Sequence, residues 1–347
     1  MLTLEKFKQS VRWHCWAHGK LPLFCMTMLY VILKQSLYSI QTIKQFFIFL
    51  IFIILASIYG YLINDLFDME IDRIHGKKNA FEKMGRLRGG LIIFLIFLTD
   101  ILLGSHFLLK TYFPHLLIVL YFFATFYSAP PVRFKERGAP GLFVVFLTQY
   151  PLPVMMIFSV FDSFGSIDMW GFALFATITG ATQEIGHQRS DLDSDSSTGT
   201  NTFAVRQGHG KIDRIYRIFV FLDMISMTGI LVIMNLKLQL VTIYGYGYTI
   251  LPPLVLYLIF AGVVTKKILE KKEDVVDPYF IEGRNDIFNL TFTLFPNVFL
   301  PFYIACLTCV KYPMFIVFPG VFSLITFITF PNASIIRQIR VVYNDLN

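Results

Sequence analysis

Residues 44–63 read KQFFIFLIFIILASIYGYLI, and the polar stretch Asn64-Asp65-Leu-Phe-Asp68-Met-Glu-Ile-Asp72 follows at once. The first stretch matches the ~20 apolar residues that an α-helix needs to cross the hydrocarbon core of a bilayer. The second stretch is acidic, and carboxylates inside a membrane are costly unless they are paired or functional. The two together predict a transmembrane helix that ends in a polar site at the membrane surface.

The rest of the chain has the composition of a membrane protein. Of its 347 residues, 55% are hydrophobic and 15% are charged, whereas a soluble domain carries roughly 25% charged residues. The 38 phenylalanines exclude a disordered or low-complexity chain. The net charge of +7 could indicate nucleic acid, but in a membrane protein we assign it to loops that face anionic lipid. We therefore predict a lipid bilayer and no nucleic acid as partner.

Ten apolar runs are long enough to be membrane spans. The basic segment 1–20 precedes the first run and is followed by bulky residues without a small-residue cleavage site, so we predict a cytoplasmic N-terminal segment and no cleaved signal peptide. The predicted spans are 21–40, 44–63, 89–110, 113–130, 141–161, 168–186, 216–236, 240–265, 286–309 and 313–332.

The distribution of positive charge orients these spans. When the spans alternate from a cytoplasmic N-terminus, most of the 30 Lys and Arg residues fall on the cytoplasmic side, as the positive-inside rule requires. Both termini and the long loops 64–88, 187–215 and 266–285 are then cytoplasmic, so we expect function on that face. The exceptions on the outside are Lys34, Lys44, Lys110, Lys237 and Lys311.

The first acidic cluster has helical spacing. If the second helix continues past residue 63, Asn64, Asp68 and Asp72 project from one face and Asp65 lies at its edge. Carboxylates at this spacing repel one another, so a positive group should neutralise them. Hard oxygen ligands of this kind suit Mg²⁺, which commonly bridges substrate phosphates.

A second cluster ends the sixth predicted span. His187, Asp191 and Asp195 share one helical face, and alternation of the spans puts them at the same cytoplasmic depth as the first cluster. Either cluster alone could be a set of solvated loop acids. Both together predict a two-sided clamp for a metal ion and a diphosphate.

A basic segment after the fourth span supplies counter-charge. Pro130 and Pro131 end the helix, and Arg133, Lys135 and Arg137 then occupy alternate positions, as an extended segment would present them to one side. Such cations fit diphosphate oxygens. Ordinary positive-inside anchoring also explains this segment when it is taken alone.

These three segments resemble the motifs of the UbiA superfamily of intramembrane prenyltransferases. The motif N-D-x-x-D-x-x-x-D, the motif D-x-x-x-D-x-x-x-G-x-x-T and a Tyr-Ser-x-Pro…Lys segment occur in the family's order and on one side of the membrane. The matching residues are Asn64, Asp65, Asp68 and Asp72; Asp191, Asp195, Gly199 and Thr202; and Tyr127, Ser128, Pro130 and Lys135.

The resemblance implies an all-α transmembrane bundle with a central cavity that opens toward the cytoplasm. It also implies one prenyltransferase domain over residues 1–347. The family usually has nine helices, so of our ten spans we regard 313–332 as the extra one.

The resemblance further implies Mg²⁺-dependent transfer of a polyprenyl group from a prenyl diphosphate to an aromatic or lipid-like acceptor. A fixed metal and cation array stabilises charge on the leaving diphosphate, and a dry cavity protects the allylic cation. The implied metal ligands are Asn64, Asp65, Asp68, Asp72, Asp191 and Asp195. The implied diphosphate-binding residues are Tyr127, Arg133, Lys135 and Arg189. The residues implied as catalytic are Asp68, Asp191 and Lys135.

Two polar residues next to the second motif lie outside its minimal pattern. His187, one turn before Asp191, could orient that carboxylate or help deprotonate the acceptor, and Glu184 lies one turn further back. A polar helix end without chemistry explains them equally well.

Other functions fit the sequence less well. A transporter that uses intramembrane acids as an ion pathway predicts acids in mid-span and related halves, but the main acids inside apolar runs are Asp100 and Asp223 and we find no repeat. A CDP-alcohol phosphotransferase would carry a D-G-x-x-A-R element, which this chain lacks. We predict a multi-pass protein, in the inner membrane if bacterial, with a cytoplasmic active site. The sequence leaves the acceptor, the donor length and the oligomeric state open.

Overall fold

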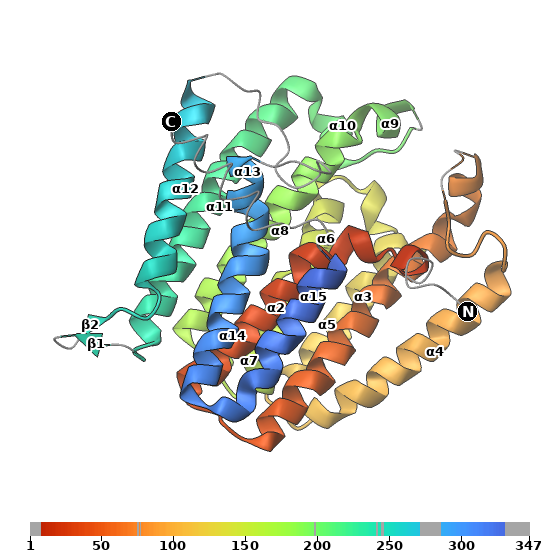
Figure 1. Cartoon of the computed structure of the whole chain (residues 1–347). Helices are drawn as coiled ribbons and strands as arrows, with labels where there is room; N and C mark the ends of the chain where they lie inside the picture. Colours follow the sequence, from red (N-terminus) through yellow and green to blue (C-terminus); the bar gives the residue numbers. More distant parts are fainter. Residues whose placement is uncertain are drawn as a thin grey trace.

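A computed structural model shows a bundle of helices that run roughly along one common direction (Figure 1). It describes residues 8–74, 76, 78–197, 199–240, 242–243, 246–270 and 286–329. The elements are α2(Trp13–Gln35), α3(Ile40–Ile74), α4(Arg86–Gly104), η1(Ser105–Phe107), α5(Phe113–Ser128), η2(Phe134–Glu136), α6(Ala139–Gln149), α7(Pro151–Val160), α8(Ile167–Ser190), α9(Leu192–Ser197), α10(Phe203–Gln207), α11(His209–Lys237), β1(Thr242–Ile243), β2(Tyr246–Gly247), α12(Leu251–Leu269), α13(Ile287–Asn289), η3(Leu290–Phe299), α14(Leu300–Lys311), η4(Pro313–Ile316) and α15(Val317–Thr329).

The predicted all-α membrane fold is confirmed. Seven helical segments of the described chain are long and apolar enough to span a membrane, and Phe113–Ser128 and Pro313–Thr329 are shorter apolar helices. Residues 330–332 of the last predicted run lie outside the described part of the chain. The described residues of the ten predicted runs fall on helical structure with short breaks, except for the first part of 240–265. There β1 and β2 form an antiparallel hairpin, and α12 begins only at Leu251, with Pro at its first turn. The number of spans remains a prediction.

The predicted span 141–161 is two helices instead of one. Helix α6 ends at Gln149, and α7 begins at Pro151. Proline lacks the backbone N–H that would continue the helix and restricts the residue before it, so Tyr150 takes a non-helical conformation with φ −131° and ψ −76°. The break lies between the two buried polar regions described below.

Helix α3 continues well past the apolar run, as the spacing of its acids predicted. It extends to Ile74, so that the acidic motif is helical. Phe46, Phe49 and Phe52 are fully buried, and α3 packs along α4 and α5. The acids are therefore mounted on a rigid helix whose apolar half is locked into the bundle.

The first helix begins earlier than predicted. Helix α2 starts at Trp13, so residues 13–20 of the predicted N-terminal segment 1–20 are helical and its first seven residues lie outside the described part. Lys20 is only 4% exposed. The sequence places Lys20 in the predicted cytoplasmic segment 1–20, whereas the structure buries it in the bundle.

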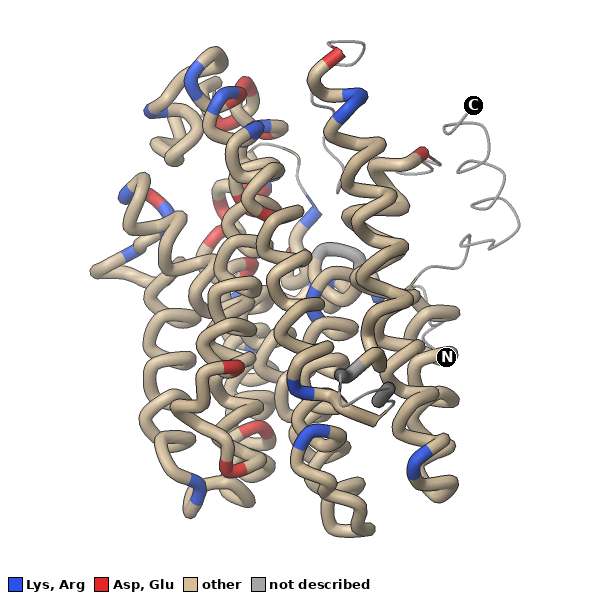
Figure 2. The backbone as a smooth tube through the Cα atoms, turned by 90° about the vertical axis from the view of Figure 1, so that its left-hand side faces the viewer, with Lys and Arg blue, Asp and Glu red and all other residues tan. Residues whose placement is uncertain are grey.

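Charged residues gather toward one end of the bundle, and its middle consists largely of uncharged residues (Figure 2). The helices α9 and α10 lie at one end and the hairpin β1–β2 lies at the opposite end (Figure 1). Both acidic motifs and the basic segment lie toward the end that carries α9 and α10.

Candidate active site

A cavity of about 280 Å³ lies between α2, α3, α5, α6 and α8, next to η2. Its apolar lining residues include Phe24, Ile53 and Leu120. Its polar lining residues include Arg12, Lys20, Asn64, Asp68, Tyr127, Lys135, Gln149, Glu184 and His187. An apolar chain and a charged head group can therefore be held in one space.

Asp68 is the centre of the charged wall. The Lys135 ammonium contacts both carboxylate oxygens of Asp68, and Arg133 Nη2 lies 3.2 Å from Oδ1. Lys135 Nζ also reaches Asn64 Oδ1 at 3.4 Å, and that oxygen accepts a hydrogen bond of 2.6 Å from the Ser128 hydroxyl. The predicted cationic partner of the first motif is thus present.

Burial affects the protonation equilibrium of this pair. Desolvation lowers the pKa of Lys135 below its ordinary value, while the Asp68 carboxylate opposes that shift. Lost hydration thus disfavours the charged form of the Lys135 ammonium, and the close carboxylate favours it. An anionic ligand could supply the same favourable interaction.

The backbone that carries the cations differs from the prediction. We expected an extended segment, but Phe134–Glu136 is a 3₁₀ helix. Arg133 and Lys135 still reach the same carboxylate, whereas exposed Arg137 donates to the Val132 carbonyl at 2.5 Å. A methyl group on Gly141 would lie 2.3 Å from the Phe134 carbonyl oxygen, so glycine there allows η2 to pack against α6.

Helix α8 contributes to the same cavity as the first motif. Glu184 of α8 lines it together with Asp68 of α3 and Tyr127 of α5, so segments far apart in sequence meet there. Asp191 and Asp195 are not among the residues that line the cavity, and the proximity of the second motif to the first remains a prediction.

The second motif follows the end of α8. The helix ends at Ser190 with Asp191 as its C-cap, and the backbone N–H of Asp195 donates to the Asp191 carbonyl at 2.8 Å. The His187 imidazole Nδ1 lies 3.5 Å from Asp191 Oδ2, which fits an orienting role. Gln188 Nε2 donates to Glu184 at 3.3 Å.

Two members of the first motif are held by neighbouring backbone and side chains instead of lining the cavity. Asp65 Oδ1 lies 2.8 Å from Arg12 Nη2, and its Oδ2 accepts the Ala80 N–H at 3.1 Å. Asn79 donates to Asp72 Oδ2 and to the Asp65 carbonyl, both at 2.7 Å. These contacts tie the segment after α3 to the helix end, and the metal-ligand role of both acids remains a prediction.

Arg189 has partners on a different helix. It forms an ion pair with Asp213 of α11, and its guanidinium lies 5.5 Å from the Tyr216 ring centroid. Arg189 is not among the residues that line the cavity. Its predicted contact with a diphosphate would therefore require a change of partner.

Sequence reasoning missed Arg12 and Lys20. Lys20 donates to the Tyr61 hydroxyl at 3.0 Å and to the Gln149 amide oxygen, and it lies 5.1 Å from the Tyr61 ring centroid. Helix α2 begins at Trp13, so Lys20 lies two turns inside it and eight residues after Arg12. Recognising this earlier helix start in the sequence would have been the signal for these two residues.

The oxygen ligands fit Mg²⁺ chemically. Asn64 and Asp68 on one side and Asp191 and Asp195 on the other offer hard oxygen atoms, and Mg²⁺ needs only one or two carboxylates when waters and phosphate oxygens complete its shell. Within the described ranges, no three His, Cys, Asp or Glu side chains form a group that could hold an ion by themselves. This arrangement suits an ion shared with a phosphorylated substrate.

The chain belongs to the UbiA prenyltransferase family, which it matches over residues 23–277. It is 26% identical over 214 residues to a 2-acylphloroglucinol 4-prenyltransferase of Humulus lupulus, which covers 56% of this chain and 50% of that protein. It is 25% identical over 228 residues to a digeranylgeranylglyceryl phosphate synthase of Sulfurisphaera tokodaii, covering 65% and 78% of the two chains. The matched region thus spans about half the length of the Humulus relative.

The fold is similar to that of a solved UbiA homologue from Archaeoglobus fulgidus that is bound to GPP and Mg²⁺. The TM-score is 0.57 at 15% identity, and the match covers 86% of this chain and 97% of that chain. At this identity the likeness shows the fold, which is an integral-membrane type of helical bundle.

Proposed function

We propose that the protein is a Mg²⁺-dependent prenyltransferase that moves a polyprenyl group from a prenyl diphosphate to an acceptor within the membrane. The observation that carries this proposal is the contact of Lys135 and Arg133 with Asp68 beside a cavity that also has apolar lining residues. Glu184 and His187, which precede the second motif on α8, line the same cavity. A prenyl diphosphate has a charged head and an apolar tail, so its binding site needs both charged and apolar lining residues.

The metal would be held by Asn64 and Asp68 from α3 and by Asp191 and Asp195 beyond α8. Bound there, Mg²⁺ would neutralise charge on the diphosphate as its bond to the allylic carbon breaks. The other predicted ligands, Asp65 and Asp72, would keep the end of α3 in place through their contacts with Arg12 and Asn79.

Lys135 and Arg133 would stabilise the leaving diphosphate directly. Both cations contact Asp68, and phosphate oxygens would offer them further charge-assisted acceptors. When the allylic C–O bond breaks, the electron pair stays on the diphosphate, where these fixed cations lower its energy. Tyr127 could donate its hydroxyl to the same group, and Arg189 would do so only after leaving Asp213.

The cavity wall would govern what happens to the allylic cation. Phe24, Ile53 and Leu120 line the cavity and exclude water, which would otherwise capture the cation. The acceptor carbon then forms the new bond to the prenyl group and loses a proton. Glu184 and His187 line the same cavity and are the candidates to take that proton or to orient Asp191.

The acceptor is proposed to be aromatic or lipid-like. The names of the Humulus and Sulfurisphaera relatives indicate one acceptor of each kind. We further propose one domain over residues 1–347, an active site on the cytoplasmic side, an inner-membrane location if the source is bacterial, and 313–332 as the additional span.

The test is a product analysis with purified protein. The protein is incubated with Mg²⁺ and a panel of prenyl diphosphates of increasing length, each with aromatic and lipid-like acceptors, and prenylated products are identified by mass spectrometry. We expect a prenylated product and inorganic diphosphate in equal amounts. An Asp68→Ala variant that makes the same product at the wild-type rate would contradict the proposal.

A further inference from the structure

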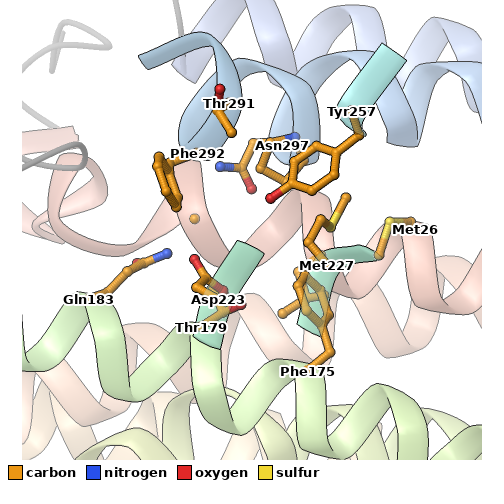
Figure 3. A pocket seen from close by; sticks show the side chains of 13 residues that line it. Met26, Phe175, Thr179, Gln183, Asp223, Met227, Tyr257, Thr291, Phe292 and Asn297 are labelled. Carbon is orange, nitrogen blue, oxygen red and sulfur yellow. Dashed lines mark hydrogen bonds between the residues drawn. The ribbon is translucent and has the colours of Figure 1, made fainter. Parts of the chain in front are cut away.

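A second cavity, with polar and apolar lining residues, lies between α2, α8, α11, α12 and η3. Its volume is about 20 Å³, and a cavity needs at least about 10–15 Å³ to hold one water-sized body. Side chains from separate helices point toward this common space, among them Asp223, Asn297 and Tyr257 (Figure 3). None of these residues belongs to the prenyltransferase motifs.

Asp223 is the charged member of this group. It lies at the centre of α11, is 5% exposed and accepts a hydrogen bond of 2.6 Å from the Thr179 hydroxyl. Among the described residues that line the cavity, it is the one that carries a carboxyl group. A carboxylate halfway along a membrane span is costly and indicates a functional site by default.

Two polar groups that face Asp223 have unused hydrogen-bonding capacity. The Asn297 side chain is 7% exposed and Tyr257 is 1% exposed. Within the described part of the chain, neither the Asn297 amide nor the Tyr257 hydroxyl has a hydrogen-bond partner. Buried polar groups are normally satisfied, so this pair points to a polar occupant of the cavity.

The backbone beside Asn297 offers a further oxygen atom. Residues 290–299 form a π-helix that contains Pro296. Proline has no N–H and therefore cannot donate the i→i+5 bond to the carbonyl of Thr291, and Thr291 also lines the cavity. Interrupted helices in membrane proteins coordinate cations through carbonyl groups of this kind.

We propose that this cavity binds one monovalent metal cation. The oxygen atoms of Asp223, Thr179, Tyr257, Asn297 and the Thr291 carbonyl are the ligands, and hard cations prefer oxygen. One positive charge neutralises the single carboxylate, whereas a divalent ion would leave an uncompensated charge in a low-dielectric interior.

The cation site and the candidate active site are adjacent but share no lining residue among those described. The Tyr150 hydroxyl donates to Gln183 at 2.5 Å, and Gln183 lines the inner cavity whereas its neighbour Glu184 lines the outer one. The bound cation would link α8, α11, α12 and η3 and so stabilise the fold. The inference does not depend on the proposed prenyl transfer.

The experiment measures thermal unfolding of the purified full-length protein in detergent by intrinsic fluorescence. NaCl is titrated against N-methyl-D-glucamine chloride at constant ionic strength and without Mg²⁺ or prenyl diphosphate. We expect Tm to rise and saturate with Na⁺. At about ten times Kd the folding equilibrium shifts about tenfold, which raises Tm by roughly 2–4 °C.

Two variants with the same type of substitution locate the effect. Asp223→Asn keeps an acceptor for Thr179 but removes the charge, and we expect it to lose the Na⁺ response. Asp100→Asn is the matched control, because Asp100 of α4 is also fully buried and accepts a hydrogen bond from Tyr121 but does not line this cavity. This control should keep the Na⁺ response.

The cation proposal can be tested even if the Asp223→Asn variant does not fold. Equal Tm values of the wild-type protein in both salts would overturn the proposal and leave a water molecule as the occupant. Asn297→Ala retains the carboxylate and removes one oxygen ligand, so it should raise the half-saturating Na⁺ concentration by about tenfold or more. An unchanged concentration would also overturn the proposed ligand set.

Discussion

Lys135→Ala should separate a catalytic cation from an ordinary membrane anchor. The change removes the ammonium that contacts both oxygens of Asp68 and reaches Asn64. The matched control is Arg137→Ala, since Arg137 is exposed and donates to a backbone carbonyl of its own segment. The positive-inside rule treats the two residues alike, whereas the structure does not.

The expected magnitude follows from the contact that is lost. A charge-assisted hydrogen bond to a phosphate oxygen contributes about 1.5–3 kcal/mol, and about 1.4 kcal/mol corresponds to a tenfold change in rate. Lys135→Ala should therefore lower kcat/KM by roughly ten- to a hundredfold. Arg133 lies 3.2 Å from Asp68 and pairs also with Glu136 at 2.5 Å, so Arg133→Ala should have an intermediate effect.

The assay is prenyl transfer by the three alanine variants at matched protein concentrations, with the donor and acceptor identified in the product analysis. Thermal unfolding of each variant controls for loss of fold, and Arg137→Ala should stay within about 0.5 kcal/mol of the wild-type stability. Equal and mild losses in all three variants would refute the reasoning and leave Lys135 as an anchor.

Three further predictions concern the metal, the second motif and the topology. EDTA should abolish transfer and added Mg²⁺ should restore it, so full activity in metal-free buffer would exclude the metal clamp. Asp191→Ala should remove most activity without loss of fold because this acid lies at a helix end and is only partly buried; near-normal turnover would assign it to structure. Reporters fused after Asn347 and within 266–285 should both be cytoplasmic, and opposite sides would mean nine spans.

The fold class and the end of the bundle where the motifs lie follow from local sequence. An apolar run of about 20 residues can satisfy its backbone in a bilayer only as a helix or a closed barrel, so each run specifies its structure locally. The spacing of Asn64 and Asp68 within one continuous helix is local information too. Their common direction toward the cavity could therefore be predicted, and the helix α3 extends to Ile74 as that spacing requires.

Which polar groups meet depends on how the helices pack. Lys20 counts as a loop cation in the sequence, but packing buries it beside Tyr61 and Gln149. Asp65 carries the same charge as Asp68 and belongs to the same motif, yet it faces Arg12. Helical periodicity fixes the face on which a side chain lies, whereas its partner depends on how helices distant in sequence pack together.

The inner cavity illustrates the same limit. Asp223 stood out in the sequence as an acid in an apolar run, but nothing near it in sequence indicated Asn297 or Tyr257 as its neighbours. Those groups come together because α11, α12 and the π-helical segment 290–299 pack around one small space. Local sequence determines each helix, and long-range packing determines the chemistry between helices.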